Sequence, residues 1–420
     1  EAQPAGQPWW VMRLQPLPAA ALTLRLPAGR WTLAQRPLPQ QVASGGGCWV
    51  QLPPAAGLTP QALTRRSAAA AAPAATPQEV AVQAPVWSEP LAAGRWRISN
   101  GLLAAELGAG GLEQLWGADG QPQLAAPLQW RRWHDSGEFW DAWDLAADHR
   151  EHPLPLEWEP ALELVEQGPL CVRLVARGRC GASPLRLDLR LLAGSPWLEL
   201  VLRVHWRQRH ELLQLEVPLQ QRACRWAADT PAGVLERPAV PCTAREKARW
   251  EVPAIAWTCS QAERGGLAVL LDGPQGVSGT AERLGISLLR GPTWPDPGAD
   301  NGLQRLRLAL MPCADGWRQA AVPAAARAFR APSWCRPATS PAVPPPALAL
   351  GSAQLDPVAI APEAEPGVVR LTVQNLSPCR QPLGLSAGWQ VIGPAEPLLP
   401  PWALRHLRVR RVTPAQAQSS

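Results

Sequence analysis

One short stretch of the sequence gathers most of the side chains that could do chemistry. Residues 131–150 read RRWHDSGEFWDAWDLAADHR, whereas most of the chain alternates apolar and polar residues. Indole rings beside carboxylates suit sugar binding, because the rings cover apolar C–H faces and the acids accept hydrogen bonds from hydroxyl groups. The alternative is an exposed loop whose tryptophans anchor it to the core. The side chains concerned are His134, Asp135, Glu138, Asp141, Asp144, Asp148, His149, Trp133, Trp140 and Trp143.

The elements that must position this stretch are predicted to be β-strands. Strict period-two alternation, as at 185–191, 198–204 and 213–217, is typical of half-buried strands, and the 49 prolines argue against long helices. Short turns such as Gly108-Ala109-Gly110-Gly111 join successive strands without helical periods between them, which favours antiparallel sheets. We therefore predict an all-β fold, a large antiparallel β-sandwich with smaller flanking β domains.

A chain of 420 residues is too long for one compact core, and its composition suggests where it divides. Two low-complexity segments, SAAAAAPAAT at 67–76 and the prolines around 344–346, are expected to be linkers. The predicted organisation is an N-terminal β-strand region (1–66), an Ala/Pro-rich linker (67–84), the main sandwich (85–331), a Pro-rich linker (332–349) and a small C-terminal β domain (350–414).

Charge, hydropathy and cysteine usage exclude several classes of protein. The net charge of +6 is dispersed and lacks the Gly/aromatic basic pattern of RNA-binding proteins, so no nucleic-acid partner is expected. No stretch approaches the ~18 apolar residues of a membrane span. The nine cysteines are scattered and never spaced as Cys-x-x-Cys, which favours free thiols in a reducing compartment. With no signal peptide in evidence, although the chain lacks an initiator Met, we expect a cytoplasmic protein.

Four phrases of the sequence resemble one family in their order and spacing. They are HDSGEFWDAWDL (134–145), AREKARWEVPA (244–254) with Trp257 shortly after it, GGLAVLLD (265–272) and LLRGPTWPDPGADNG (288–302). Together they resemble the C-terminal half of a glycoside hydrolase family 38 α-mannosidase of the cytosolic and vacuolar type. The closing LPPWALRHLRV (399–409) is similar to the last strand of that family.

The resemblance implies a β-sandwich similar to the galactose-mutarotase superfold, packed on an N-terminal catalytic α/β domain. In the family that domain holds a divalent metal, usually zinc, through a His-x-Asp pair, a nucleophilic Asp and a second His. None of the six histidines here has an Asp two positions later. A local site would have to use His134, Asp135, Asp141, Asp144 and His149, on one loop without rigid support. We therefore expect no catalytic residue, metal ligand or cofactor in this chain, and a family catalytic domain as its partner in cis or in trans.

The family's sandwich also contributes to the substrate pocket, and the resemblance carries this role to two segments. Trp143 corresponds to an aromatic residue beside the bound mannose, and the loop from Asp296 to Gly302 reaches the same pocket. Arg290 either pairs with a nearby carboxylate and holds the loop, or is an ordinary strand-end arginine. The predicted substrate-binding residues are Asp141, Trp143, Asp144, Arg290, Asp296, Asp300 and Asn301.

Three positions depart from the family pattern, because Ile255, Gln304 and Cys313 stand where related sequences tend to have histidines. Such losses indicate either relaxed constraint or a divergent branch. The function predicted is the non-catalytic, carbohydrate-binding sandwich part of an α-mannosidase. The alternatives are a stand-alone carbohydrate-binding sandwich and an interaction scaffold without a sugar site.

Overall fold

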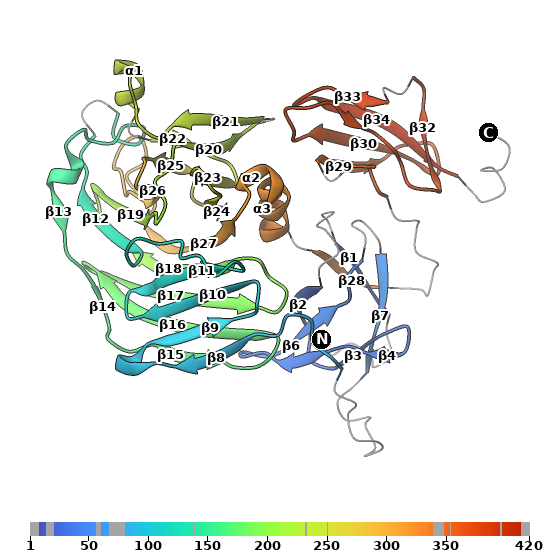
Figure 1. Cartoon of the computed structure of the whole chain (residues 1–420), viewed down its shortest axis with the longest axis horizontal. Coiled ribbons are helices and arrows are strands. Elements are labelled where there is room, and N and C mark those ends of the chain that lie inside the picture. The colour runs from blue at the N-terminus through green and yellow to red at the C-terminus, as the bar shows by residue number, and fades with distance from the viewer. Residues whose placement is uncertain are drawn as a thin grey trace, which may run out of the picture. The chain divides into compact units, whose positions relative to one another are not determined.

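The computed structural model describes residues 8–13, 21–55, 60–66, 80–137, 140–231, 233–249, 251–331, 333–338, 348–352, 354–394 and 397–412. The chain forms two compact units (Figure 1). One comprises Glu1–Ala81, Pro231–Val234 and Pro323–Ser420, and the other Val82–Thr230 and Leu235–Val322. The predicted linkers 67–84 and 332–349 lie largely outside the described residues, so the predicted domain boundaries stay a prediction.

The unit around residues 82–322 is built on three antiparallel sheets. The ten-stranded sheet has the order β14 (Leu156–Trp158), β16 (Cys171–Cys180), β17 (Ser183–Leu192), β18 (Leu198–Trp206), β27 (Gly302–Cys313), β24 (Gly266–Asp272), β23 (Trp257–Gln261), β20 (Arg225–Thr230) and β21 (Gly233–Pro238), with β15 (Glu163–Glu166) also paired to β16. The six-stranded sheet has the order β13 (Pro153–Leu154), β12 (Gln129–His134), β19 (Glu211–Pro218), β26 (Arg283–Leu289), β25 (Gly276–Gly279) and β22 (Val252–Pro253). The four-stranded sheet has the order β11 (Gly111–Gly117), β10 (Leu103–Gly108), β9 (Trp96–Ser99) and β8 (Trp87–Pro90).

The helical elements of the described chain are short. They are the 3-10 turns η2 (Ala92–Gly94) and η3 (His149–Glu151) and the helices α1 (Ala244–Lys247), α2 (Gly316–Gln319) and α3 (Val322–Arg330). At nine residues, α3 is the longest described helix, and none of the described helices is long and apolar enough to cross a membrane.

Packing between sheets buries the apolar face that the alternation predicts. In β17, Leu185, Leu187, Leu189 and Leu191 are buried, and β11 of the four-stranded sheet lies against this strand. The approach is close at Gly111 (φ +103°), where an added Cβ would meet Leu187 Cδ2 at 2.9 Å. The antiparallel all-β sandwich predicted from the sequence is therefore confirmed.

The polar face of the same sheet is partly buried as well, which alternation alone does not predict. Asp188 of β17 is 2% exposed and accepts hydrogen bonds from Arg173 at 2.6 Å and from Arg186 at 3.0 Å. Arg203 also pairs with it. The arginine stems cover the carboxylate while their guanidinium groups compensate its charge. This part of the sheet is therefore held by ion pairs as well as by apolar packing.

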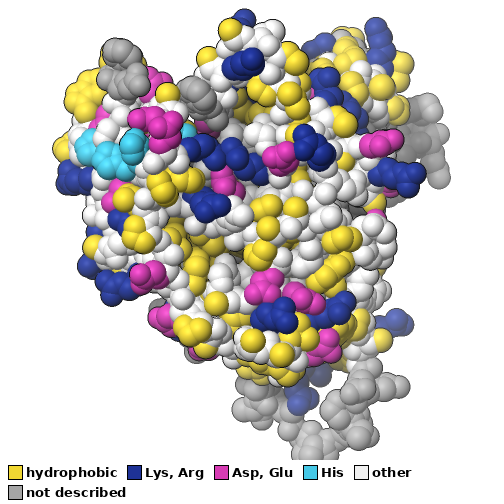
Figure 2. Space-filling model, turned by 60° about the vertical axis from the view of Figure 1, so that its left-hand side comes forward, with side chains coloured by type: hydrophobic (Ala, Val, Ile, Leu, Met, Phe, Trp, Pro, Cys, Tyr) yellow, Lys and Arg dark blue, Asp and Glu magenta, His cyan; other side chains and the backbone are white. Residues whose placement is uncertain are grey.

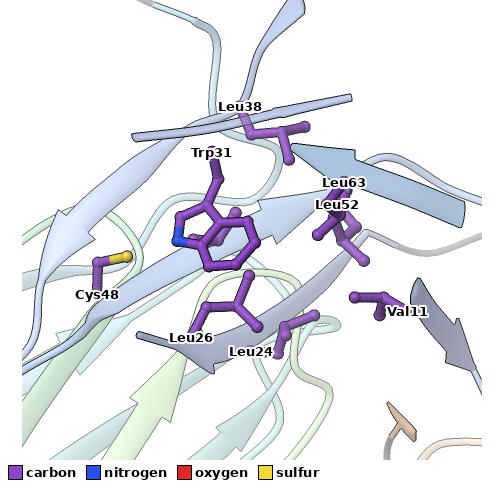
Figure 3. Close-up of a cluster of buried hydrophobic side chains, with 9 residues drawn as sticks. Val11, Leu24, Leu26, Trp31, Leu38, Cys48, Leu52 and Leu63 are labelled. Atoms are coloured by element: carbon purple, nitrogen blue, oxygen red, sulfur yellow. The ribbon is translucent and has the colours of Figure 1, made fainter. Parts of the chain in front are cut away.

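The other unit contains four smaller sheets. A cluster of buried side chains around Trp31, including Leu24, Leu26 and Leu63, forms one core (Figure 3). A second cluster includes Leu355, Leu371 and Val409. The sheet orders are β28 (Ser333–Pro337), β1 (Pro8–Arg13), β7 (Pro60–Arg66), β3 (Arg30–Leu33) and β4 (Arg36–Pro37); β2 (Leu22–Leu26), β6 (Cys48–Leu52) and β5 (Gln40–Val42); β29 (Leu355–Pro362), β30 (Val368–Asn375), β34 (Leu404–Arg411) and β32 (Trp389–Ile392); and β31 (Gln381–Pro382) with β33 (Leu398–Leu399).

Strand β28 lies inside the range predicted to be an extended spacer. It pairs antiparallel with β1, with Val11 opposite Cys335. Between its first residue and Pro337 the strand contains no proline, so its backbone N–H groups can donate to a partner strand. The proline-rich spacer predicted at 332–349 therefore begins with a paired strand.

Candidate functional site

The site sits where three neighbouring strands of the six-stranded sheet end. Strands β12, β19 and β26 are adjacent and antiparallel, so the end of β12, the start of β19 and the end of β26 share one edge. Backbone hydrogen bonds continue past the strands, from Asp135 N to His210 O (2.8 Å) and from His210 N to Gly291 O (3.0 Å). This brings together the segments after residues 134 and 289, which carry all seven predicted substrate-binding residues.

Arg290 fastens these two segments to each other. Its Nε donates to Oδ2 of Asp135 at 2.7 Å, and its Nη2 donates to the Asp144 carbonyl at 2.6 Å. The Asp135 side chain is 1% exposed, and its Oδ1 accepts from Ala146 N at 2.8 Å. Of the two interpretations of Arg290, the structure shows the one in which it pairs with a carboxylate and holds the loop. Contact between Arg290 and a substrate stays a prediction.

Asp141 makes a second connection between the same segments. Its Oδ2 accepts hydrogen bonds from Thr293 N (2.6 Å), Thr293 Oγ1 (3.1 Å) and Trp294 N (3.0 Å), and His210 Nδ1 lies 3.4 Å from Oδ1. Burial alone would raise the pKa of the Asp141 carboxyl group, but the hydrogen bonds from Thr293 and Trp294 lower it below its ordinary value. Asp141 is thus ionised and engaged by protein donors.

The loop between β26 and β27 shapes itself through its own polar side chains. Asp300 (φ +62°) accepts hydrogen bonds on Oδ2 from Arg290 N (2.7 Å) and Gly291 N (3.1 Å). Asp296 Oδ1 accepts from Gly298 N at 2.8 Å, and Asn301 Nδ2 donates to Ala299 O at 3.1 Å. Asp300 therefore joins the network around Arg290, whereas the contacts of Asp296 and Asn301 remain within their loop.

Three tryptophans on these segments form an exposed aromatic cluster. Trp140, Trp143 and Trp294 are 54%, 64% and 52% exposed. The ring centroids are 6.1 Å apart for Trp140 and Trp143, 5.9 Å for Trp140 and Trp294, and 5.6 Å for Trp143 and Trp294. Since large apolar side chains are rarely left together in water, such a surface indicates a binding face. We call Trp140, Trp143 and Trp294 the tryptophan cluster.

Several members of this site were not singled out from the sequence. Trp294 lies in a Pro/Gly-rich loop, where an unburied tryptophan is a signal that could have been used. Thr293 and His210 carry no such signal, because each matters through a partner far away in the sequence. Glu138 lies outside the described residues.

In the space-filling view, histidine and acidic side chains lie beside one another on one face of the molecule (Figure 2).

The five residues considered for a local metal site do not converge on one point. Asp135 is paired with Arg290, Asp141 accepts backbone N–H groups, and His149 is buried with its Nδ1 2.7 Å from Ala146 O. Among the described residues, no group of three or more His, Cys, Asp or Glu side chains could hold a metal ion. The donors of this edge therefore fit a role in holding the loops and do not fit a metal centre.

The fold and site define an all-β protein whose sandwich presents aromatic and acidic side chains at one sheet edge. Residues 98–298, just under half of the chain, match the glycosyl hydrolases family 38 C-terminal domain. The matched range contains five of the seven predicted substrate-binding residues and the whole of the tryptophan cluster, while Asp300 and Asn301 follow its end. The site at the edge of the six-stranded sheet therefore falls mainly within the matched range.

Curated relatives align with part of this chain and with a smaller part of their own length. Alpha-mannosidase 2C1 of Homo sapiens is 33% identical over 213 residues, covering 49% of this chain and 20% of that protein. Alpha-mannosidase 2C1 of Mus musculus is 30% identical over 288 residues, covering 64% and 27%. Alpha-mannosidase G of Dictyostelium discoideum is 31% identical over 183 residues, covering 42% and 17%. The matched segments thus span about a quarter or less of these relatives.

Solved structures share the fold over nearly the whole chain. An alpha-mannosidase from Enterococcus faecalis V583 superposes with a TM-score of 0.73 at 11% identity, covering 96% of this chain and 56% of that chain. A second Enterococcus faecalis structure, of a protein in glycosyl hydrolase family 38, gives a TM-score of 0.70 at 10% identity, covering 96% and 58%. At such low identity the likeness concerns the fold alone.

Proposed function

We propose that this chain is the carbohydrate-contacting, non-catalytic β-sandwich part of an α-mannosidase that acts on terminal α-mannosides in the cytoplasm. The observation that carries the proposal is the tryptophan cluster, three exposed indoles within 6.1 Å of one another at a sheet edge of a family 38 domain. Exposed indole faces beside carboxylates suit the alternating apolar and hydroxyl surfaces of a pyranose ring.

Within this surface the residues have different roles. Trp143, the most exposed of the three indoles, offers its ring to the C–H face of the sugar. Asp144 is exposed beside it, so its carboxylate is available to accept hydrogen bonds from sugar hydroxyl groups. Asp141 and Arg290 act by holding the two loops in register, because protein donors and acceptors already occupy their polar atoms. Asp296, Asp300 and Asn301 line the neighbouring loop and bound the site on that side.

Bond cleavage is assigned to a family catalytic α/β domain acting with this sandwich in cis or in trans. Retaining glycoside hydrolysis needs a nucleophilic carboxylate and an acid/base about 5 Å apart across the scissile bond. Asp135, Asp141 and Asp300 are instead bonded to arginine or to backbone N–H groups, which leaves Asp144 without a second free carboxylate beside it, among the described residues, to form such a pair. The sandwich therefore contributes orientation of the sugar, and proton transfer and nucleophilic attack are left to the partner domain.

Two measurements on the purified chain test this function. Methyl α-mannoside should bind saturably, whereas an aryl α-mannoside should release no phenol, with or without added zinc. Turnover that depends on zinc would overturn the non-catalytic role. Failure of any α-mannoside to bind at tens of millimolar, roughly the limit for a weak single-sugar site, would overturn the carbohydrate-contacting role.

The tryptophan cluster also keeps open a second candidate, a stand-alone carbohydrate-binding sandwich that holds glycans without contributing to hydrolysis. The two candidates differ in their need for a partner. If adding a family 38 catalytic domain to the chain changes neither glycan affinity nor hydrolysis of aryl α-mannosides, the stand-alone function is favoured. A rise in hydrolysis on mixing favours the α-mannosidase part.

A further inference from the structure

A cavity lies in the same unit as the tryptophan cluster but is lined by none of the three tryptophans. It has a volume of about 440 Å³ and is bounded by η3, the middle of β19, strands β20, β21, β22 and β25, and helix α1. None of the seven predicted substrate-binding residues lines it. Its volume lies within the range of small-ligand pockets. Five cationic side chains line it, Arg150, Arg237, Lys247, Arg249 and Arg283, against three carboxylates, Glu236, Glu246 and Glu251.

The three carboxylates are already engaged. Glu246 accepts hydrogen bonds from Cys242 N and Thr243 N, both at 3.0 Å, in the capping box of α1. Glu236 accepts from Trp317 Nε1 at 3.1 Å and from Arg318 at 2.6 Å. Glu251 accepts from the Ser287 hydroxyl group, and burial raises the pKa of its carboxyl group. These contacts fix the carboxylates in place, and the five cations of the cavity still outnumber the three carboxylates.

The cations fall into two groups. Arg150 and Arg283 both reach Oε1 of Glu216, at 2.9 and 3.3 Å, so they share one carboxylate oxygen. Arg237, Lys247 and Arg249 form no ion pair with any carboxylate of the described residues. Burial, and then the charge of Arg249, lower the pKa of the Arg237 guanidinium group. Hydrogen bonds from Thr243 and Cys242 and, after them, the charge of Arg249 lower the pKa of the Glu246 carboxyl group, so Glu246 partly compensates Arg249. Arg237 and Lys247 bring positive charge to the cavity without an ion-paired carboxylate among the described residues.

Arg237 is held in place on an aromatic base. Its Cζ lies 5.1 Å from the centroid of the Trp226 ring, and a Cβ added at Gly279 would approach that ring to 2.5 Å. The indole is therefore confined between the Gly279 backbone and the guanidinium group. Arg237 Nη1 is buried and has no hydrogen-bond partner among the described residues. A planar guanidinium group fixed on an indole keeps its donors oriented for a bidentate oxyanion.

We propose that this cavity binds a small phosphorylated ligand, with Arg237, Lys247 and Arg249 contacting the phosphate group. An excess of two positive charges around the cavity matches a phosphate ester dianion better than a single carboxylate. The volume exceeds that of a bare phosphate ion, which leaves room for an organic part such as a sugar. The inference does not depend on the tryptophan cluster or on the proposed function.

Lys247, the only lysine of the sequence, makes a direct measurement possible. Reductive dimethylation with ¹³C-formaldehyde labels this side chain and the N-terminal amine, and it preserves both positive charges. Inorganic phosphate should shift the Lys247 methyl signal saturably, and the N-terminal signal should stay in place. Sodium chloride at equal ionic strength should not reproduce the shift, and a shift of the same size with chloride would overturn the proposal.

Matched variants separate the site from general attraction of anions. Arg237→Gln and Arg249→Gln should each raise the half-saturating phosphate concentration about tenfold or more, since each removes a charged donor. Arg245→Gln removes the same charge from α1 outside the cavity and should change it less than about twofold. Because Arg249 is exposed, its variant tests the site even if Arg237→Gln does not fold. Equal effects of Arg249→Gln and Arg245→Gln would contradict the proposal.

Two ligands distinguish the sources of the phosphate. If a hexose 6-phosphate binds more tightly than inorganic phosphate, the remaining space of the cavity accommodates the sugar. If the two ligands bind with equal affinity, the cavity recognises the phosphate group alone. Both results support the proposal. Binding of the unphosphorylated hexose as tightly as its 6-phosphate would overturn it.

Discussion

Arg290 and Asp135 form the ion pair that fixes the candidate site, with Arg290 Nε 2.7 Å from Asp135 Oδ2. The two residues lie 155 positions apart, at the ends of strands separated by one neighbour in the sheet. Because Arg290 also donates to the Asp144 carbonyl, it determines where the segment carrying Trp140 and Trp143 lies relative to the segment carrying Trp294.

Replacing Arg290 should therefore destabilise the protein strongly. Arg290→Gln leaves the Asp135 carboxylate, 1% exposed, without its cation, and should lower the free energy of unfolding by about 3–5 kcal/mol. Arg222→Gln, which breaks the exposed pair with Glu282, should cost less than about 1 kcal/mol. Urea unfolding followed by circular dichroism measures both. Equal costs for the two variants would show that the Arg290 pair does not hold the loops.

Gly291 should tolerate no side chain. It has φ +70°, and an added Cβ would lie 2.4 Å from the Gln208 carbonyl oxygen. Gly291→Ala should thus lower the free energy of unfolding by about 1–2 kcal/mol for the backbone and about 1–3 kcal/mol more for the contact. Gly101→Ala is the control, since Gly101 has φ +78° and open space around it, and should show only the backbone cost. Thermal unfolding of the two variants compares their losses of stability. An equally large loss of stability in Gly101→Ala would contradict the predicted clash at Gly291.

Asp188 should make part of the stability sensitive to acid. Burial would raise the pKa of its carboxyl group, but hydrogen bonds from Arg186 and Arg173 lower it below the ordinary value of 3.8. The folded state then binds protons less readily than the unfolded state, so this stabilisation is present above pH 3.8 and is lost as the pH falls through the folded-state pKa. Asp188→Asn should cost about 3–5 kcal/mol near neutral pH. The free energy of unfolding of Asp188→Asn, measured in urea, should approach that of the wild type as the pH falls below 3.8. A difference between the two proteins that does not depend on pH would be inconsistent with this.

Glu251 should have the opposite dependence on pH. Burial raises the pKa of its carboxyl group above the ordinary value of 4.5, so the folded state holds the proton more tightly than the unfolded state. Stability should then fall as the pH rises from 4.5 through the folded-state pKa. Glu251→Gln keeps an acceptor for Ser287 and should remove this fall, so the variant gains stability relative to the wild type as the pH rises above 4.5. Glu282→Gln is the control variant, because it makes the same substitution at an exposed carboxyl group. If Glu251→Gln follows the wild-type pH profile, the account of Glu251 is wrong.

The strands could be predicted from the sequence because their burial repeats every two residues. Residues 185–191 alternate leucine with charged residues, and the structure places them in β17 with the leucines buried. The alternation did not reveal that side chains on the polar faces of the strands can be buried too, as β19 shows. Gln214 and Glu216 of β19 are 2% and 5% exposed because Arg131, Arg150 and Arg283 gather over that face. Long arginine side chains bury polar positions without changing the pattern in the sequence.

The candidate site was predicted in its segments but not in its contacts. The indoles and acids around Trp143 and the loop after Arg290 were identified from residue types and family resemblance. The partners that organise them were not, because Thr293 lies 152 residues from Asp141 and only the order of β12, β19 and β26 brings them together. The sequence pattern contains no information on which carboxylate Arg290 meets, and Trp294 joins the cluster only through its loop.

Binding of an α-mannoside to the Trp143→Ala variant tests the central claim most directly. Trp87→Ala is the matched control, since Trp87 is 46% exposed on β8, outside the tryptophan cluster. Titration calorimetry with an α-linked mannose oligosaccharide should show affinity at least about tenfold weaker for Trp143→Ala than for the wild type, with Trp87→Ala close to the wild type. Wild-type affinity in the Trp143→Ala variant would contradict the assignment of this surface to carbohydrate.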